Sequence, residues 1–330
     1  MHGLGDDRVR ATFFLITYNQ ELYVREAIEG AFSQTYSPLE IVISDDCSTD
    51  GTFRIIEEIS RGYEGPHKLV INRNPVNLGL IGHINSITTL SSGELIVYAA
   101  GDDISLPDRT KKLVECYLAS ERKASLIHSS VYLIDNAGNI QGSRTPEVIE
   151  HGMEIAEMAL SGSLIIGATS AFTRKIEETF GPIRYHKCIE DLVMGFRSTL
   201  IGGLDSIKEP LVLYRHEAGI TARSDMTQQT CDQWTKRKIC DKEAYLAVLS
   251  QRIDDLKRIG NEDLLPLLQR KRFEELLTRK VWIGDYNFVK LAPYSLKRGV
   301  LKEFVNSWLR EKKWRFFFSL KNFMYKPDNS

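Results

Sequence analysis

The sequence predicts an α/β protein in which a mixed sheet is flanked by helices and followed by a helical C-terminal region. Over the first 125 positions, short apolar runs alternate with amphipathic stretches of about 10–15 residues, which is typical of βαβ units and a parallel sheet. Two pairs of adjacent aspartates, Asp45-Asp46 and Asp102-Asp103, each end one of these apolar runs. From about residue 225 the chain turns to long, charged, helical stretches.

The first strand is expected at Ala11–Thr17, a continuous apolar run with aromatic and branched residues. Further strands or apolar runs are expected at Glu40–Ser44, Lys68–Asn72, Leu95–Ala99, Ser125–Ile134, Ile165–Phe172 and Leu204–Arg215. Asn19 is expected to cap the first helix. The regular alternation loosens after residue 125, so mixed topology is expected there. We place a domain boundary between residues 224 and 225.

The composition is that of an ordinary globular protein, with 42% hydrophobic and 26% charged residues. The net charge of -1 gives no overall attraction to nucleic acid. The five cysteines are dispersed without CxxC spacing, which fits reduced thiols and disfavours a zinc site. Neither a signal peptide nor a run of about 18 apolar residues is found, so we expect a cytoplasmic protein, soluble or peripheral at the inner face of the membrane.

The two aspartate pairs carry the chemical prediction. In an open α/β sheet, ligands bind outside the carboxyl ends of the strands. Two pairs of like charge that converge on one crevice need a cation between them, or a ligand that donates hydrogen bonds. A nucleoside diphosphate with a hard divalent metal ion supplies both.

Two loops are candidates for contacts with the ligand. Thr17-Tyr18-Asn19 leaves the first strand, where the Thr17 hydroxyl could contact a base and Asp46 could accept the imide N–H of uracil or thymine. Asn19 could instead serve only as a helix cap. Asp102 and Asp103 follow Gly101 and suit Mn²⁺ or Mg²⁺ that also binds phosphate oxygens. For Arg109, a phosphate contact and a structural salt bridge are both open.

Taken in order, these segments resemble family 2 glycosyltransferases, which adopt the GT-A fold and transfer a sugar from a nucleotide sugar. The segments are Thr17-Tyr-Asn19, Asp45-Asp-Cys-Ser-Thr-Asp-Gly-Thr52, Asn77-Leu-Gly79 and Gly101-Asp-Asp103. The resemblance covers about residues 10–220. It implies a catalytic domain of the Rossmann-like GT-A type over residues 1–224 and a helical region over 225–330.

The resemblance also assigns roles. Thr17 and Asp46 would hold the base, Asp45 would support their loop, and Tyr18, Asn19, Asn77 and Gly79 would complete the nucleotide site. Asp102 would face the ribose or the metal ion, and Asp103 would be the main metal ligand. The metal motif of the family is usually Asp-x-Asp, whereas Gly101 occupies the first position here. It is therefore open how Asp102 and Asp103 share the binding of the metal ion.

Two later segments complete the resemblance. Cys188-Ile-Glu-Asp-Leu-Val-Met194 is similar to the family's Glu-Asp motif, so Asp191 is expected to be the catalytic base, with Glu190 as the alternate. Acidic residues are also common at a helix start, which is the structural alternative. At the end of the last strand, Arg215 could bind the diphosphate and His216 could be a metal ligand or a structural residue.

The C-terminal region is locally basic. Residues 297–330 hold nine Lys and Arg against three Asp and Glu, interleaved with aromatic residues. Docking of residues 297–326 onto an anionic membrane surface is one interpretation. Packing against the catalytic domain, or against a second subunit in a homo-oligomer, is the other. No nucleic-acid-binding motif accompanies the patch.

The function expected from the sequence is metal-dependent, inverting sugar transfer from a nucleoside-diphosphate sugar, with UDP as the default, to a saccharide or lipid-linked saccharide. Bacterial surface polysaccharide or lipopolysaccharide synthesis is the implied setting. The alternative is a non-catalytic scaffold that keeps the fold and binds nucleotide or a partner. No Gly-x-Gly-x-x-Gly or Walker A sequence follows the first strand, which disfavours nicotinamide-binding domains and P-loop enzymes.

Overall fold

A computed structural model describes residues 8–216, 231–283, 295–297 and 299–324, and the side chains of Glu150, Cys231 and residues 314–324 are not described. The chain divides into two compact units. The first holds the described residues up to 186 together with those from 190 to 216, and the second holds residues 187–189 and the described residues from 231 onward. The predicted boundary at 224 and 225 falls outside the described residues.

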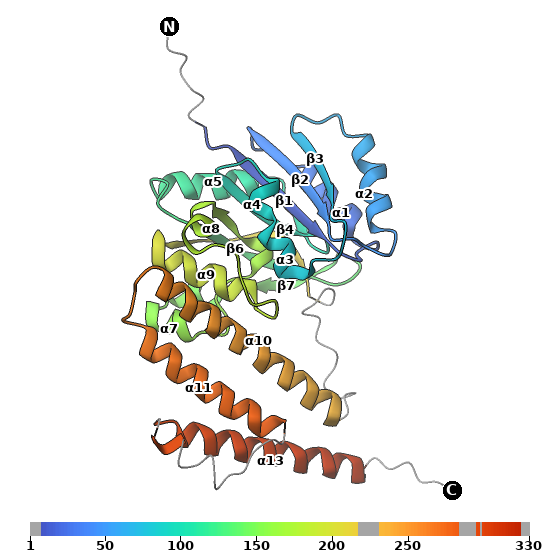
Figure 1. The fold of residues 1–330 in the computed structure, drawn as a ribbon. Helices are drawn as coiled ribbons and strands as arrows, with labels where there is room; N and C mark the ends of the chain where they lie inside the picture. The colour runs from blue at the N-terminus through green and yellow to red at the C-terminus, as the bar shows by residue number, and fades with distance from the viewer. Residues whose placement is uncertain (1–7, 217–230, 284–294, 298, 325–330) are drawn as a thin grey trace, which may run out of the picture. The chain divides into compact units, whose positions relative to one another are not determined.

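The first unit is built on a nine-stranded sheet with the order β3-β2-β1-β4-β8-β6-β9-β5, and β7 pairs with β6 (Figure 1). The strands are β1 (Ala11–Thr17), β2 (Leu39–Asp45), β3 (Lys68–Arg73), β4 (Leu95–Ala100), β5 (Ile104–Ser105), β6 (Leu126–Ile134), β7 (Ile140–Arg144), β8 (Ala171–Thr173) and β9 (Leu204–Arg215). Strands β1 to β4 are mutually parallel, and β6 is parallel to β9. Strand β8 lies antiparallel between β4 and β6, so the expected mixed topology is confirmed.

The helices of this unit connect the strands. They are α1 (Val24–Phe32), α2 (Thr52–Arg61), α3 (Gly79–Asn85), α4 (Ile87–Leu90), α5 (Arg109–Ala119), α6 (Glu147–His151), α7 (Ile155–Leu160), α8 (Lys175–Phe180) and α9 (Glu190–Ile201). Asn19 does not cap α1, because the N-cap residue is Tyr23. The Asn19 side chain instead accepts a hydrogen bond from the backbone of Thr49, and so joins the loops that follow β1 and β2.

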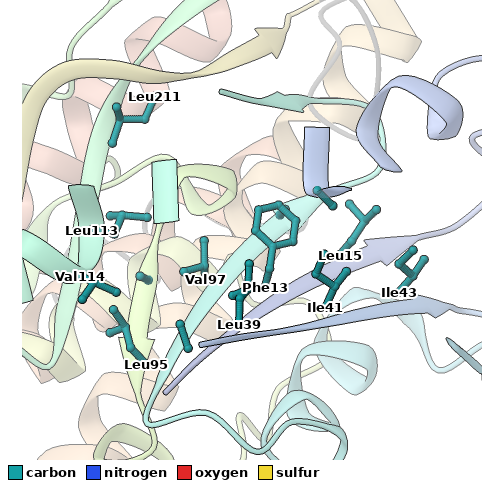
Figure 2. Packing of buried hydrophobic residues seen from close by; sticks show 14 of the residues in the cluster. Phe13, Leu15, Leu39, Ile41, Ile43, Leu95, Val97, Leu113, Val114 and Leu211 are labelled. Carbon is teal, nitrogen blue, oxygen red and sulfur yellow. The ribbon is translucent and has the colours of Figure 1, made fainter. Parts of the chain in front are cut away.

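The main core lies between the sheet and the helices α1, α2 and α5. Residues that alternate along the central strands point to the same face, and Figure 2 shows Phe13, Leu15, Ile41 and Val97 packed together in this way. All four side chains are fully or almost fully buried. The runs of apolar residues in β1, β2 and β4 are therefore explained by burial on both faces of the sheet.

The segment Ile165–Phe172 is only partly a strand, although its apolar run predicted one. It forms a 3₁₀ turn, η1 (Gly167–Thr169), and then the short strand β8. The hydroxyl of Thr169 donates to the carbonyl of Ile166 at 2.7 Å, and that of Ser170 donates to the carbonyl of Gly167 at 2.8 Å. These local side-chain hydrogen bonds stabilise the turn in place of a longer strand.

The second unit contains the long helices α10 (Cys231–Arg258), α11 (Leu265–Trp282) and α13 (Leu301–Met324), in agreement with the expected helical region. The rings of Trp234 and Trp282 meet edge to face, with their centroids 5.1 Å apart. A second apolar cluster joins Val281 of α11 to Phe304 of α13. Within the described part of the chain, every helix is too short or too polar to cross a membrane.

Candidate active site

The parallel register brings the first candidate residues to one edge of the sheet. Thr17 is the last residue of β1 and lies opposite Asp45, the last residue of β2. The Thr17 hydroxyl donates to Asp45 Oδ1 at 3.2 Å, and the backbone N–H of Asp46 donates to the carbonyl of Thr17 at 2.9 Å. All three side chains are almost fully buried. They form the floor of a polar site at the carboxyl ends of these strands.

Asp45 is engaged by the protein itself. It accepts hydrogen bonds from the backbone N–H and the hydroxyl of Ser48, and Arg73 Nε lies 3.6 Å from Asp45 Oδ2. These contacts hold the loop between β2 and α2. The geometry fits the supporting role that was expected for Asp45.

Asp46 differs from Asp45 because no described residue donates a hydrogen bond to one of its carboxylate oxygens, Oδ2. Its Oδ1 accepts from Asn74 Nδ2 at 2.8 Å and from the backbone N–H of Leu78 at 2.9 Å. Both contacts fall on the same oxygen, so Oδ2 is the atom with capacity to accept an N–H from a ligand. Asn74 was not singled out in the sequence, because nothing in its local pattern shows that it faces Asp46.

The remaining nucleotide-site candidates line the rim. Tyr18 is 45% exposed beside the floor residues. Asn77 is exposed, and its side-chain oxygen accepts from the N–H of Gly79, which has a φ of 70° and starts α3. Asn77 and Gly79 therefore shape the turn that leads into α3, since glycine adopts positive φ without steric cost.

His83 has a weaker claim to metal binding than His216 from its sequence context. It lies on α3, is buried, and its Nε2 is 2.7 Å from the hydroxyl of Ser44 in β2. Burial lowers the pKa of His83, opposed by the charges of Asp46 and Asp45. A neutral imidazole at this place links α3 to the floor of the site.

The second aspartate pair follows β4, the other parallel neighbour of β1. Asp102 is partly exposed, whereas Asp103 is only 6% exposed, and its Oδ1 accepts from the backbone N–H of Arg215 at 2.8 Å. Burial raises the pKa of Asp102. Burial together with the charge of Asp102 raises the pKa of Asp103 well above its ordinary value. The charges of Arg109 and Arg215 oppose the rise at Asp103, and a bound cation would favour the ionised form of both carboxylates further.

Gly101 is required by a close approach. A Cβ atom at this position would lie 2.4 Å from Gln20 Oε1 and 2.8 Å from Thr17 Cγ2. A larger residue at the first place of the metal motif would therefore require the side chains of Gln20 and Thr17 to shift.

Arg215 connects the loops around the second pair. Its Nε donates to the carbonyl of Asp102, its Nη1 donates to the carbonyls of Asp135 and Asn136, and its Nη2 lies 2.5 Å from Glu26 Oε2. The side chain is 1% exposed and stacks on the Tyr23 ring at 4.5 Å. The guanidinium expected to bind diphosphate is thus already engaged by protein acceptors.

Arg109 and His216, for which a ligand contact and a structural role were both open, have protein partners in the structure. Arg109 is fully buried and donates to the hydroxyl of Ser105 and the carbonyl of Tyr98, so the structure supports its structural role and not a phosphate contact. The backbone N–H of His216 donates to the carbonyl of Ile134, and the side chain is exposed. Across the described residues, no group of three or more His, Cys, Asp and Glu side chains is placed to hold a metal ion.

The Glu190-Asp191 pair begins α9. Burial raises the pKa of Asp191 to about 6, opposed by the backbone N–H of Gly167, Glu190 and Arg144. Burial and the neighbouring Asp191 raise the pKa of Glu190 well above its ordinary value. Asp191 Oδ1 is buried and accepts no hydrogen bond from the described residues, and a Cβ atom on Gly167 would lie 2.0 Å from it. A carboxylate with a pKa near 6 suits a general base.

Tyr98 is influenced by the charges of both acidic pairs. It is the fourth residue of β4 and is 6% exposed. Burial raises its pKa well above the ordinary value, and the charges of Glu190, Asp191, Asp102 and Asp103 raise it further. One hydroxyl therefore lies within electrostatic reach of all four carboxylates.

Comparison with known proteins gives the same assignment. The family model described as "Glycosyl transferase family 2" matches residues 12–181, slightly more than half of the chain. The putative glycosyltransferase EpsE of Bacillus subtilis is 29% identical over 181 residues, which cover 54% of this chain and 63% of EpsE. The abequosyltransferase RfbV of Salmonella typhimurium is 30% identical over 126 residues, 38% of this chain and 35% of RfbV. The chain spans about three fifths of the length of the first curated relatives it matches.

Solved structures share the fold. TarS of S. aureus in complex with UDP-GlcNAc superposes with a TM-score of 0.56 at 14% identity, covering 93% of this chain and 91% of that one. The mannosyltransferase PcManGT from Pyrobaculum calidifontis, in complex with GDP-Man and Mn²⁺, gives a TM-score of 0.52 at 16% identity, with 97% and 88% coverage. At such identities the likeness establishes the GT-A type of fold and nothing finer.

Proposed function

Because this chain belongs to family 2 of the glycosyl transferases, we propose that it transfers a sugar from a nucleoside-diphosphate sugar to a saccharide acceptor, with inversion at the anomeric carbon. The observation that carries the proposal is that β4 links two acidic pairs: Tyr98 of this strand lines a pocket with Glu190 and Asp191, and Asp102-Asp103 follow the strand. One pair suits a cation with a diphosphate, and the other contains a carboxylate with the pKa of a general base.

The nucleotide would lie at the ends of β1 and β2. Asp46 Oδ2 would accept the imide N–H of a pyrimidine, and Thr17 would contact the base from the neighbouring strand. This chemistry favours uracil, and thymine presents the same edge. Exposed Tyr18 would cover the base at the rim.

The metal ion would be Mn²⁺ or Mg²⁺, which proteins hold with one or two carboxylates and substrate phosphates. The contacts support Asp102 as the direct ligand, because it is the more exposed carboxylate of the pair, whereas Asp103 already accepts from Arg215. This reverses the order of importance expected from the sequence. When bound, the ion would offset the negative charge that develops on the leaving diphosphate.

The transfer would be a single displacement in which Asp191 acts as the base. The acceptor hydroxyl oxygen forms a bond to the anomeric carbon as the bond from that carbon to the diphosphate oxygen breaks. The proton of the hydroxyl passes to Asp191, and the nucleoside diphosphate leaves. Asp191 is suited to this step because its pKa of about 6 leaves it ionised, yet basic, near neutral pH. Glu190 would act on the reaction through its effect on the pKa of Asp191.

The acceptor is proposed to be a saccharide, free or lipid-linked, in the synthesis of a bacterial surface polysaccharide. The similarity to EpsE and to an abequosyltransferase supports this setting. Docking of residues 297–326 onto a membrane surface, and homo-oligomer formation, stay predictions, since the side chains from 314 onward lie outside the described part.

The proposal is tested by titrating UDP, dTDP, GDP and CDP into the protein with and without Mn²⁺. We expect one pyrimidine diphosphate to bind in a metal-dependent way. Asp102→Asn should abolish metal-dependent nucleotide binding, because it removes the more exposed carboxylate of the pair. Asp103→Asn should only weaken metal-dependent nucleotide binding. Glu57→Gln, which neutralises an exposed carboxylate on α2, is the control and should bind like the wild type. Absence of nucleotide binding under every condition would contradict the proposal.

A further inference from the structure

A small pocket lies beside the Glu190-Asp191 pair, inside the first unit. Its apolar walls are the side chains of Ile84, Ile165, Phe172 and Met194 and the ring of Tyr98. Its free volume of about 20 Å³ holds one group of the size of a water molecule or a methyl group. Such a pocket is the natural place for a small apolar substituent next to the reacting atoms.

The pocket wall offers few hydrogen-bond partners to a hydroxyl group. Ser170 also lines the pocket, but its hydroxyl already donates to the carbonyl of Gly167 at 2.8 Å. Apart from the two carboxylates and the Tyr98 hydroxyl, the lining consists of aliphatic and aromatic carbon. A sugar hydroxyl buried against that carbon would lose its hydrogen bonds to water, which disfavours it there.

The donor sugar is the group that would reach this pocket. Its anomeric carbon is joined to the diphosphate, which is proposed to lie at Asp102, and must also come within reach of the acceptor hydroxyl at Asp191. Tyr98 lines the pocket together with Asp191, and Asp102 follows Tyr98 by four positions, just beyond the end of β4. The sugar ring therefore passes over the pocket mouth.

We propose that this pocket is a subsite for a methyl group on the donor sugar, either the C6 methyl of a 6-deoxyhexose or the methyl of an acetamido group. The inference rests on the proposed sugar transfer and specifies its donor. A methyl group fits the free volume and the apolar walls. A hydroxymethyl or hydroxyl group that faced the carbon walls would lose hydrogen bonds to water.

The test compares three sugars on whichever nucleoside diphosphate the protein binds: glucose, 6-deoxyglucose and N-acetylglucosamine. Dissociation constants are measured with Mn²⁺ present. One methyl-bearing donor is expected to bind about tenfold more tightly than the glucose donor. A preference for 6-deoxyglucose identifies the C6 methyl as the occupant, and a preference for N-acetylglucosamine identifies the acetamido methyl. Equal dissociation constants for all three donors would overturn the inference.

Variants of Ile165 connect the preference to the pocket. Ile165→Phe fills it and should abolish the preference for the methyl-bearing donor, while the bare nucleoside diphosphate binds as before. Ile165→Ala enlarges it and should reduce the preference, and this variant avoids overpacking. The control Ile140→Phe changes an exposed residue of β7 and should keep the preference. A preference that survives both Ile165 variants would contradict the assignment.

The two proposals fail in distinguishable ways. If no nucleoside diphosphate binds, the proposed function itself fails. If the bare diphosphate binds with metal but the three sugars are not distinguished, the nucleotide site stands and only the methyl subsite fails.

Discussion

The chemistry of individual residues in this chain is set by how each carboxylate is surrounded. Asp45, Asp46, Asp102, Asp103 and Asp191 are all near one end of the sheet, yet each has a different set of partners. Asp45 and Asp103 are held by protein donors, whereas no described residue donates to Asp46 Oδ2, and Asp191 is buried beside Glu190 with a raised pKa. The roles follow from this difference and not from the residue type.

The pKa of Asp191 predicts how the reaction depends on pH. Only the ionised carboxylate can accept the proton, so kcat should rise with pH, reach half its plateau near pH 6 and become constant above about pH 7. The measurement is kcat at saturating donor between pH 5 and 8, with nucleotide binding measured at each pH.

Asp191→Asn should lower kcat by about 10²–10⁴-fold and leave the dissociation constant of the nucleoside diphosphate unchanged. Glu190→Gln is the matched control and should retain a larger share of the activity. A profile for the wild type that stays flat through pH 6 would remove Asp191 from the role of base.

At the scale of elements, short turns between strands position the reacting groups. Gly167 of the turn η1 lies next to Asp191 in the first turn of α9. There is no room for a side chain at position 167 beside Asp191. β9 ends at Arg215, which joins the loops after β4 and β6 to Glu26 on α1. These contacts join segments that are far apart in the sequence.

Gly167→Ala tests the first of these contacts. The added Cβ would lie 2.0 Å from Asp191 Oδ1, so the carboxylate must move, and we expect kcat to fall by about 100-fold. Metal-dependent nucleotide binding should be unchanged, because Gly167 lies away from the floor residues Thr17 and Asp46. The control Gly142→Ala adds the same atom in open space on β7 and should have no effect. Full activity in Gly167→Ala would show that the position of Asp191 does not matter.

Arg215→Lys tests the second contact. Lysine keeps the charge but cannot donate in the fork geometry to the four oxygen acceptors, so the free energy of unfolding should fall by about 2 kcal/mol. Affinity for Mn²⁺ in the presence of nucleotide should fall as well, since the Arg215 guanidinium holds the carbonyl of Asp102, whereas the backbone N–H that donates to Asp103 is kept in the variant. The measurements are urea unfolding and a Mn²⁺ titration.

Arg54→Lys, on the exposed side of α2, is the control for Arg215→Lys and should leave both quantities unchanged. Loss of stability without any loss of Mn²⁺ affinity would mean that Arg215 supports the fold alone.

At the scale of the whole molecule, buried titratable groups set the pH dependence of stability. Burial lowers the pKa of His128 to about 4, because this side chain in β6 is fully buried and neither ring nitrogen has a hydrogen-bond partner among the described residues. The unfolded chain binds a proton near the ordinary value of about 6.5, so stability is lost as pH falls from 6.5 to about 4. Asp191 acts in the opposite direction: its raised pKa weakens the fold as pH rises from about 4 to about 6.

His128→Leu isolates the histidine contribution. The difference between a pKa of about 4 and about 6.5 corresponds to about 3 kcal/mol, so the variant should gain about 2 kcal/mol relative to wild type on going from pH 7.5 to pH 4.5. The measurement is urea unfolding at both pH values. His151→Leu, which changes an exposed histidine at the end of α6, is the control. An identical pH dependence in His128→Leu and wild type would show that the histidine is not held neutral.

Local sequence was sufficient for the central strands, because an apolar run that is buried on both faces is visible in the chain itself, but not for the short β5 and the exposed β7. Ala11–Thr17 and Leu204–Arg215 have the bounds that were predicted, and the long C-terminal helices lie where the charged helical stretches were found. The aspartate pairs were found in the same way, since they end such runs. The family follows from the order of these motifs.

The tertiary structure decided what the local pattern does not contain. Asp103 and Arg215 are 112 positions apart, and only their contact shows that Asp103 is engaged while Asp102 is the more exposed carboxylate. The burial of Arg109, the acceptors around Arg215 and the pocket at Ile165 likewise depend on packing between distant segments. A sequence pattern fixes which way a side chain leaves its own strand, but burial and hydrogen-bond partners are set by the segments that fold against it.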